Sequence, residues 1–288
     1  MFNEILSIIK NASCKSFEDI SESLEACVNS EVNFVDVLRQ IGIIPEFISH
    51  ASSEEKLFAK SSDIVLARAF CELGLKAVVL RERGDSADVL AESKYFNYTL
   101  VADAKAFRLS RTAKNQKDFK VSALSSWRKD NNFAVLCAPY FQYPTKISQV
   151  YSQALANNVC LLSWEHLIFL IENGIKENSK LNLSGLWNFS ETLSKRVLVS
   201  DMKKNFLHEF NNFLADFLNI SRKTFDSSLK AQIVALQERS ELEKNFWLEE
   251  IQHIKNYSRK QAIDELIKSL KIHEKLTQIK AFIESIKQ

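Results

Sequence analysis

The sequence predicts an α/β fold in which a mixed central sheet lies between N-terminal helices and a C-terminal helical bundle. Apolar residues recur at helical spacing before residue 76 and after Trp187, but between Lys76 and Trp164 they gather into short runs rich in Val, Leu and aromatic residues. All eight glycines and prolines lie at or before Gly185. Everything beyond that residue can therefore be helical.

The first 75 residues predict a layer of helices. Apolar positions keep helical spacing from residue 2 to about residue 50, where Gly42 and Pro45 supply a stop. A longer helix is predicted over 53–75, because serines precede it as caps and its apolar side chains fall on roughly one face.

The central segment predicts five strands, at residues 76–81, 88–93, 98–105, 133–139 and 159–164. Turn-forming residues such as Gly84 and Asn97 separate the first three, which indicates an antiparallel meander. Predicted helices over 114–129 and 146–157 separate the last three, and such alternation favours parallel crossover pairing. We therefore expect one mixed sheet.

Beyond Trp187 the pattern predicts several further helices, as Phe206, Phe210 and Phe217 illustrate by their helical spacing. These helices either pack as an appendage of the core or form an interface that joins protomers or flanks a long ligand. We expect a core with its N-terminal helices over 1–185, and a helical region that joins protomers or flanks a ligand over 186–288.

Composition excludes several classes of protein. Hydrophobic residues make up 46% and charged residues 26% of the 288 residues, as in an ordinary globular protein, and the net charge of +2 does not announce a nucleic-acid partner. No window is long and apolar enough to cross a bilayer, and the start lacks a signal peptide, so we expect a cytoplasmic protein without a membrane partner. The scattered Cys14, Cys27, Cys71, Cys137 and Cys160 are expected to be reduced thiols.

The candidate catalytic residues lie on two neighbouring predicted strands. Asp103 and Lys105 are two residues apart and therefore leave the same face of their strand. Asp88 begins the preceding strand, and an antiparallel return can bring it beside Asp103. Two ionised carboxylates repel each other unless a cation lies between them, and a hard divalent ion such as Mg²⁺ accepts such ligands together with phosphate oxygens. The alternative is a solvated salt bridge at a strand end.

These groups together predict phosphodiester hydrolysis. The ion would polarise the scissile phosphate and lower the pKa of a water, while Lys105 would position that water or neutralise charge on the phosphorane. The five histidines, of which His166 is expected to be a packing or hydrogen-bonding residue, form no zinc or paired-histidine motif, and no phosphate-binding loop for ATP is present.

A run of basic residues follows the catalytic strand. Six Lys or Arg residues recur at every third position from Lys105 to Lys120, and Asp118 is the one acidic residue among them. The local net charge is therefore +5. We expect phosphate contacts and base contacts from Arg108, Arg111, Lys114, Asn115, Gln116, Lys117 and Lys120. A solvated helix face is the alternative.

A set of stretches spread over most of the chain carries a family likeness: PEFI, EKLFAKSSDIVLARAF, FNYTLVADAKAFRLSRTAKNQKDFKVSALSSW, APYFQYPT, SWEHL, WNF and ERSELEKNFW. Together they resemble the HindIII-type type II restriction endonucleases of the PD-(D/E)xK superfamily. The resemblance implies a restriction-endonuclease-like fold and a homodimer that cuts a short palindrome in double-stranded DNA, AAGCTT in the family's namesake, with Mg²⁺ as cofactor. It also implies a restriction-modification system, in which a cognate methyltransferase is a genetic rather than a physical partner.

Carried over residue by residue, the resemblance implies metal ligation by Asp88, Asp103 and Ala104, with Lys105 as the catalytic lysine. The superfamily's usual proline before the first acid is missing, because Ala87 precedes Asp88. Glu55, on the helix before the sheet, matches the place where many members carry an additional catalytic acid.

Two other functions remain open from the residues alone. A non-catalytic, helical DNA-binding protein would need only the basic run, and a structure-selective junction resolvase would need the same metal site and a dimer. Cleavage of plasmid DNA with Mg²⁺ but not with EDTA separates the first, and discrete fragments from linear duplex DNA argue against the second.

Overall fold

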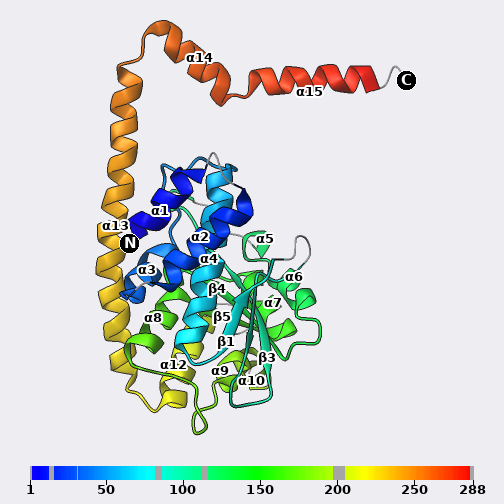
Figure 1. Ribbon diagram of the computed structural model, residues 1–288, viewed down its shortest axis with the longest axis vertical. Coiled ribbons are helices and arrows are strands. Elements are labelled where there is room, and N and C mark those ends of the chain that lie inside the picture. Colours follow the sequence, from blue (N-terminus) through cyan, green and yellow to red (C-terminus); the bar gives the residue numbers. More distant parts are fainter. Residues whose placement is uncertain are drawn as a thin grey trace. The chain divides into compact units, whose positions relative to one another are not determined.

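The computed structural model describes residues 2–12, 16–30, 32–81, 86–111, 116–196 and 205–285. Its centre is one five-stranded sheet with the order β1-β2-β3-β4-β5 (Figure 1). The strands are β1 (Lys76–Val79), β2 (Val89–Glu92), β3 (Thr99–Ala104), β4 (Phe133–Ala138) and β5 (Val159–Ser163). The predicted α/β fold with a mixed sheet is confirmed, and helices precede and follow the sheet along the chain.

The pairing of β3 explains why the sheet is mixed. β1, β2 and β3 form an antiparallel meander, whereas β3, β4 and β5 pair in parallel through helical crossovers. In the antiparallel ladder Val89 pairs with Ala102. One further step in this register places Asp88 opposite Asp103, on the same face of the sheet.

Four helices precede the sheet: α1 (Phe2–Lys10), α2 (Phe17–Asn29), α3 (Phe34–Ile41) and α4 (Ser53–Glu72). The Ser52 side chain caps α4 by accepting a hydrogen bond from the Glu55 backbone N–H. α4 packs against β1, β2 and β3 through its buried face. After it, Gly74 has φ +94° and an added Cβ would lie 2.7 Å from the Glu177 carbonyl oxygen, so only glycine fits this turn.

The first crossover is two short helices, not the single helix predicted over 114–129. α5 (Gln116–Phe119) and α6 (Val121–Trp127) meet at Lys120, whose φ of 51° is left-handed. Phe119 and Val121 are both fully buried. Residues two apart in a continuous helix do not face the same side, and the break at Lys120 lets both side chains reach the core. The second crossover carries α7 (Gln149–Asn157), as predicted.

The helices that follow the sheet begin by completing its core. They are α8 (Trp164–Glu172), α9 (Ser184–Trp187), α10 (Phe189–Ser194), α12 (Phe206–Leu218) and the first part of α13 (Arg222–Lys255). Fully buried His166 on α8 stacks on Phe225 and hydrogen-bonds Asn211 through Nε2 at 2.8 Å. This confirms that His166 is a packing and hydrogen-bonding residue.

By compactness the chain forms two units, Met1–Ser240 and Glu241–Gln288, and the predicted functional division at residue 185 stays a prediction. The second unit holds the end of α13, α14 (Arg259–Ser269) and α15 (Ile272–Ser285), and α14 has no buried residue. Among the described residues, no helix combines the length and apolar character needed to cross a bilayer. Cys27, Cys71, Cys137 and Cys160 are free thiols as predicted, and Cys14 lies outside the described residues.

Candidate active site

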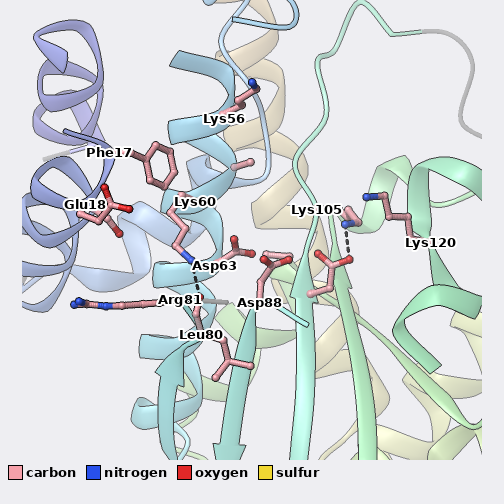
Figure 2. A pocket seen from close by; sticks show the side chains of 14 residues that line it. Phe17, Glu18, Lys56, Lys60, Asp63, Leu80, Arg81, Asp88, Lys105 and Lys120 are labelled. Carbon is pink, nitrogen blue, oxygen red and sulfur yellow. Dashed lines mark hydrogen bonds and ion pairs between the residues drawn. The ribbon is translucent and has the colours of Figure 1, made fainter. Parts of the chain in front are cut away.

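Three carboxylates converge beside the sheet. Asp63 of α4, Asp88 just before β2 and Asp103 of β3 each offer an oxygen, and these oxygens all lie within 4.8 Å of one another (Figure 2). Asp103 is 1% exposed and Asp63 6% exposed, while Asp88 is half-buried. The three side chains line a cavity of about 420 Å³.

The local sequence explains each placement. The antiparallel register brings Asp88 and Asp103 together from the start of one strand and the end of the next. Asp63 lies in the run SSDIVL on the buried face of α4. The two serines before it bond back to their own helix, Ser61 to the Leu57 carbonyl and Ser62 to the Phe58 carbonyl. Both hydroxyls are thus used within the helix, and Asp63 is the carboxylate that α4 presents to the cavity.

The electrostatics of the cluster fit a cation. Burial, and then the charges of Asp88 and Asp103, raise the pKa of Asp63 well above its usual range. Burial, and then the Asp103 carboxylate, also raise the pKa of Asp88. The Oδ1 atom of Asp103 is buried and has no hydrogen-bond partner among the described residues. A divalent cation would relieve the repulsion and satisfy that oxygen, so the donor set fits a hard ion with oxygen ligands.

Lys105 lies beside the cluster with its ammonium ion-paired to the Asp103 carboxylate. Its backbone N–H donates to the Cys137 carbonyl oxygen at 2.7 Å, which extends the parallel pairing of β3 and β4 by one residue. Ala104 lines the same cavity. The structure therefore brings together four residues singled out from the sequence, Asp88, Asp103, Ala104 and Lys105.

Glu55 does not line this cavity. Its carboxylate accepts hydrogen bonds from the Arg108 guanidinium at 2.8 Å and from the Ala51 backbone N–H at 2.7 Å. Burial raises the pKa of Glu55, but these two partners outweigh it and leave that pKa below its usual value. Glu55 thus ties the start of α4 to the segment after β3, and the acid that α4 contributes to the cluster is Asp63.

Asp63 was not among the residues predicted from the sequence. The signal that points to it is an acid inside the apolar run of α4, two turns beyond Glu55, on the side of the helix that the sheet covers. A buried carboxylate is costly unless it is paired or binds a metal, so such a position is informative once the buried face is known.

The predicted DNA-binding residues do not share one environment. Arg108 donates to the Pro45 carbonyl oxygen at 2.9 Å as well as to Glu55, and Arg111 is ion-paired with Asp118. Lys120 lines the cavity, and Lys117 is exposed. Lys114, Asn115 and the Gln116 side chain lie outside the described residues.

Comparison with known proteins gives the class first: the chain is a restriction endonuclease. Residues 2–283 match the sequence model of the HindIII restriction endonuclease family. The chain is 46% identical to the type II restriction enzyme HindIII of Haemophilus influenzae, over 99% of its own length and 95% of that protein's. It belongs to the HindIII restriction endonuclease family.

A solved structure, that of the restriction endonuclease FokI, is 13% identical with a TM-score of 0.35, over 57% of this chain. This chain spans about a third, 32%, of that structure's length. A likeness at this level carries no argument about the function of the chain.

Proposed function

We propose that the chain is a Mg²⁺-dependent endonuclease that hydrolyses double-stranded DNA at the palindrome AAGCTT. The observation that carries the proposal is the convergence of Asp63, Asp88 and Asp103 beside Lys105, with one buried carboxylate oxygen lacking a hydrogen-bond partner among the described residues. The type II activity named for the 46% identical relative supports it.

In this proposal Asp88 and Asp103 hold the ion, Asp63 adds a third carboxylate, and Ala104 contributes from the backbone between Asp103 and Lys105. When bound, a divalent ion there polarises the scissile phosphate and lowers the pKa of the attacking water. Lys105, held against Asp103, orients that water and neutralises charge that develops on phosphorus. Because the cavity buries the carboxylates, these charges act with little screening by water.

The partners of the enzyme follow from a palindromic substrate. We propose a two-fold homodimer in which each protomer cuts one strand, because an isologous dimer matches the symmetry of a palindrome. A cognate methyltransferase that protects the same sequence is the expected genetic partner, and the cytoplasm is the expected location.

The test is cleavage of a linear duplex that carries one AAGCTT site. We expect two discrete fragments with Mg²⁺ and none with EDTA. Asp103→Asn should lower the cleavage rate by more than about 100-fold while duplex binding persists, since even residues that merely support a metal ligand cost 10- to 100-fold. Asp130→Asn is the control, because Asp130 is exposed and does not line the cavity.

Other outcomes identify other functions. Duplex binding without any Mg²⁺-dependent cleavage would indicate a non-catalytic DNA-binding protein. Preferential cleavage of four-way junctions over linear duplex would indicate a resolvase. Cleavage retained by Asp103→Asn would remove that carboxylate from the metal site.

A further inference from the structure

Another lysine of the cavity, Lys60, comes from α4, whereas Lys105 follows β3. Lys60 of α4 lies three residues before Asp63, and both side chains line the cavity (Figure 2). Its Nζ donates a hydrogen bond to the Leu80 carbonyl oxygen at 3.1 Å. The contact fixes the ammonium beside the carboxylate cluster without neutralising it, because its acceptor carries no formal charge.

Lys60 and Lys105, two of the four lysines that line the cavity, differ in what they bind. Lys105 is ion-paired with Asp103, whereas Lys60 forms no ion pair among the residues that the structure describes. An ammonium has three N–H donors, and the bond to Leu80 uses one of them. Lys60 is therefore a positioned cation with donors left for an anionic ligand.

Lys56 extends this cationic wall by one helical turn. It lies four residues before Lys60 on α4, lines the same cavity and is exposed. Residues four apart on a helix are neighbours on one face. Lys56, Lys60 and Asp63 thus form a row along α4 that ends at the carboxylate cluster, as Figure 2 shows.

The row of lysines can offset the repulsion between the carboxylate cluster and the phosphates of a DNA strand. Three carboxylates repel the phosphates of a DNA strand, and Lys105 is already engaged with one of them. Binding of a DNA strand next to the cluster requires cations that compensate the phosphate charge and that are not ion-paired with the carboxylates. On α4 these are Lys60 and Lys56.

We propose that Lys60 binds a phosphate adjacent to the scissile phosphate of the cleaved strand, and that Lys56 binds the next phosphate away from the cluster. This rests on the proposed DNA cleavage and assigns part of the strand's path to α4, in addition to the basic run of residues 105–120, of which Lys105 and Lys120 line the same cavity. Lys60 holds the backbone of the strand and reads no base.

The test measures duplex binding in EDTA, so that it does not depend on cleavage. A short duplex with one AAGCTT site is titrated with the full-length protein over a range of salt concentrations. Lys60→Met and Lys56→Met should each reduce the steepness of log affinity against log salt by about 0.9 per protomer, or about 1.8 for the proposed dimer, because one phosphate contact is lost in each protomer. Lys180→Met, an exposed lysine outside the cavity, should leave the slope unchanged.

A second arm places the contact on the DNA. Each phosphate around the cleaved bond is replaced in turn by a neutral methylphosphonate. Wild-type binding should weaken at the neighbouring positions, and Lys60→Met should become insensitive at one of them while it responds normally at the others. Lys60→Gln, which retains a donor for Leu80, replaces Lys60→Met if that variant unfolds.

An unchanged salt slope in Lys60→Met and Lys60→Gln would overturn the proposal, as would wild-type methylphosphonate sensitivity in either variant. A loss of thermal stability with an unchanged slope would likewise overturn it, because Lys60 would then only anchor Leu80. Failure of the proposed function looks different: the wild-type protein would bind the duplex but would not cleave it with Mg²⁺.

Discussion

The indole N–H of Trp164 donates a 3.0 Å hydrogen bond to the carbonyl oxygen of Lys105. Trp164 begins α8 directly after β5 and is 2% exposed, so a rigid core residue holds the backbone where Lys105 leaves the sheet. Gly42 makes room for it: a Cβ at that position would lie 2.6 Å from the indole Cδ1 atom. Trp164 therefore fixes the backbone of Lys105 from within the core.

We expect Trp164→Phe to slow cleavage with little effect on binding. The variant keeps an aromatic ring in the core but removes the donor to Lys105, at a cost of about 1 kcal/mol in unfolding free energy. Misorientation of Lys105 should lower the single-turnover rate by about 10-fold, equivalent to about 1.4 kcal/mol of transition-state stabilisation, while the Kd for duplex in EDTA stays constant. Trp247→Phe, at an exposed position, serves as the control. An unchanged single-turnover rate would rule out a role in positioning.

Gly42→Ala should destabilise the protein by about 1–3 kcal/mol, as expected for overpacking in a core. The new methyl group would push the Trp164 indole away from the Lys105 carbonyl, so the single-turnover cleavage rate should fall as well. Urea unfolding measures the first effect and single-turnover cleavage the second. A stable variant with wild-type cleavage would show that the indole moves without consequence for Lys105.

Two adjacent residues on α8, the partly buried Glu165 and the buried His166, predict opposing effects of pH on stability. Burial raises the pKa of Glu165 from 4.5 to about 7, so the folded state holds a proton that the unfolded state releases, and stability falls as pH rises through this window. Burial lowers the pKa of His166 from 6.5 to about 4, so stability is lost as pH falls from 6.5 towards 4. Between about pH 4.5 and 6.5 the two effects offset each other.

Glu165→Gln removes one of these opposing effects. Relative to the wild type, the variant should gain about 2 kcal/mol of unfolding free energy between pH 5 and pH 7, because the cost of ionising a buried carboxyl disappears. Urea unfolding at both pH values measures this difference. Glu54→Gln, at an exposed position, should show no such gain. Parallel pH profiles for wild type and Glu165→Gln would contradict the assignment.

The basic run should divide into binding residues and structural residues. Lys117→Ala, and Lys114→Ala within the part of the run that is not described, should each reduce the steepness of the salt dependence of duplex binding by about 0.9 per protomer, or about 1.8 for the proposed dimer. Arg108→Ala should instead lower stability, because its guanidinium binds Glu55 and the Pro45 carbonyl inside the protein. Salt titrations together with thermal unfolding distinguish the two. A salt slope that changes only in Arg108→Ala would reverse this division.

The sequence predicted the sheet well because its strands are short apolar runs with clear breaks, and both the meander and the parallel crossovers are confirmed. The break at Lys120 was not predicted, because polar spacing over 114–129 is continuous and only the burial of both Phe119 and Val121 demands a kink. Periodicity reports which face is apolar, but tertiary packing decides where a helix must bend.

The candidate site was predicted where strand geometry determines it and missed where a helix contributes. Asp88 and Asp103 are linked by register, and Lys105 follows from the alternation of side chains on one strand. Asp63 depends on how α4 rotates against the sheet, which no local pattern specifies. Glu55 was predicted because it matches the place where members of the resembling superfamily carry an additional acid, but it does not line the cavity and its carboxylate binds Arg108.

The turn between the two acid-bearing strands, residues 93–98, lies at the far end of their ladder from Asp88 and Asp103. A change in that turn can reach the carboxylates only by slipping the strands past each other, and a slip of one residue would turn a side chain to the opposite face. Asp88 and Asp103 are therefore either paired across the ladder or turned to opposite faces of the sheet, with no intermediate register. Substitutions at the exposed Lys94, Tyr95 and Asn97 of this turn should therefore leave hydrolysis intact. Ser93 and Tyr98 are less free to change, because both are buried and their hydroxyls donate to the Glu177 carboxylate. A slip of the ladder should abolish hydrolysis in a single step.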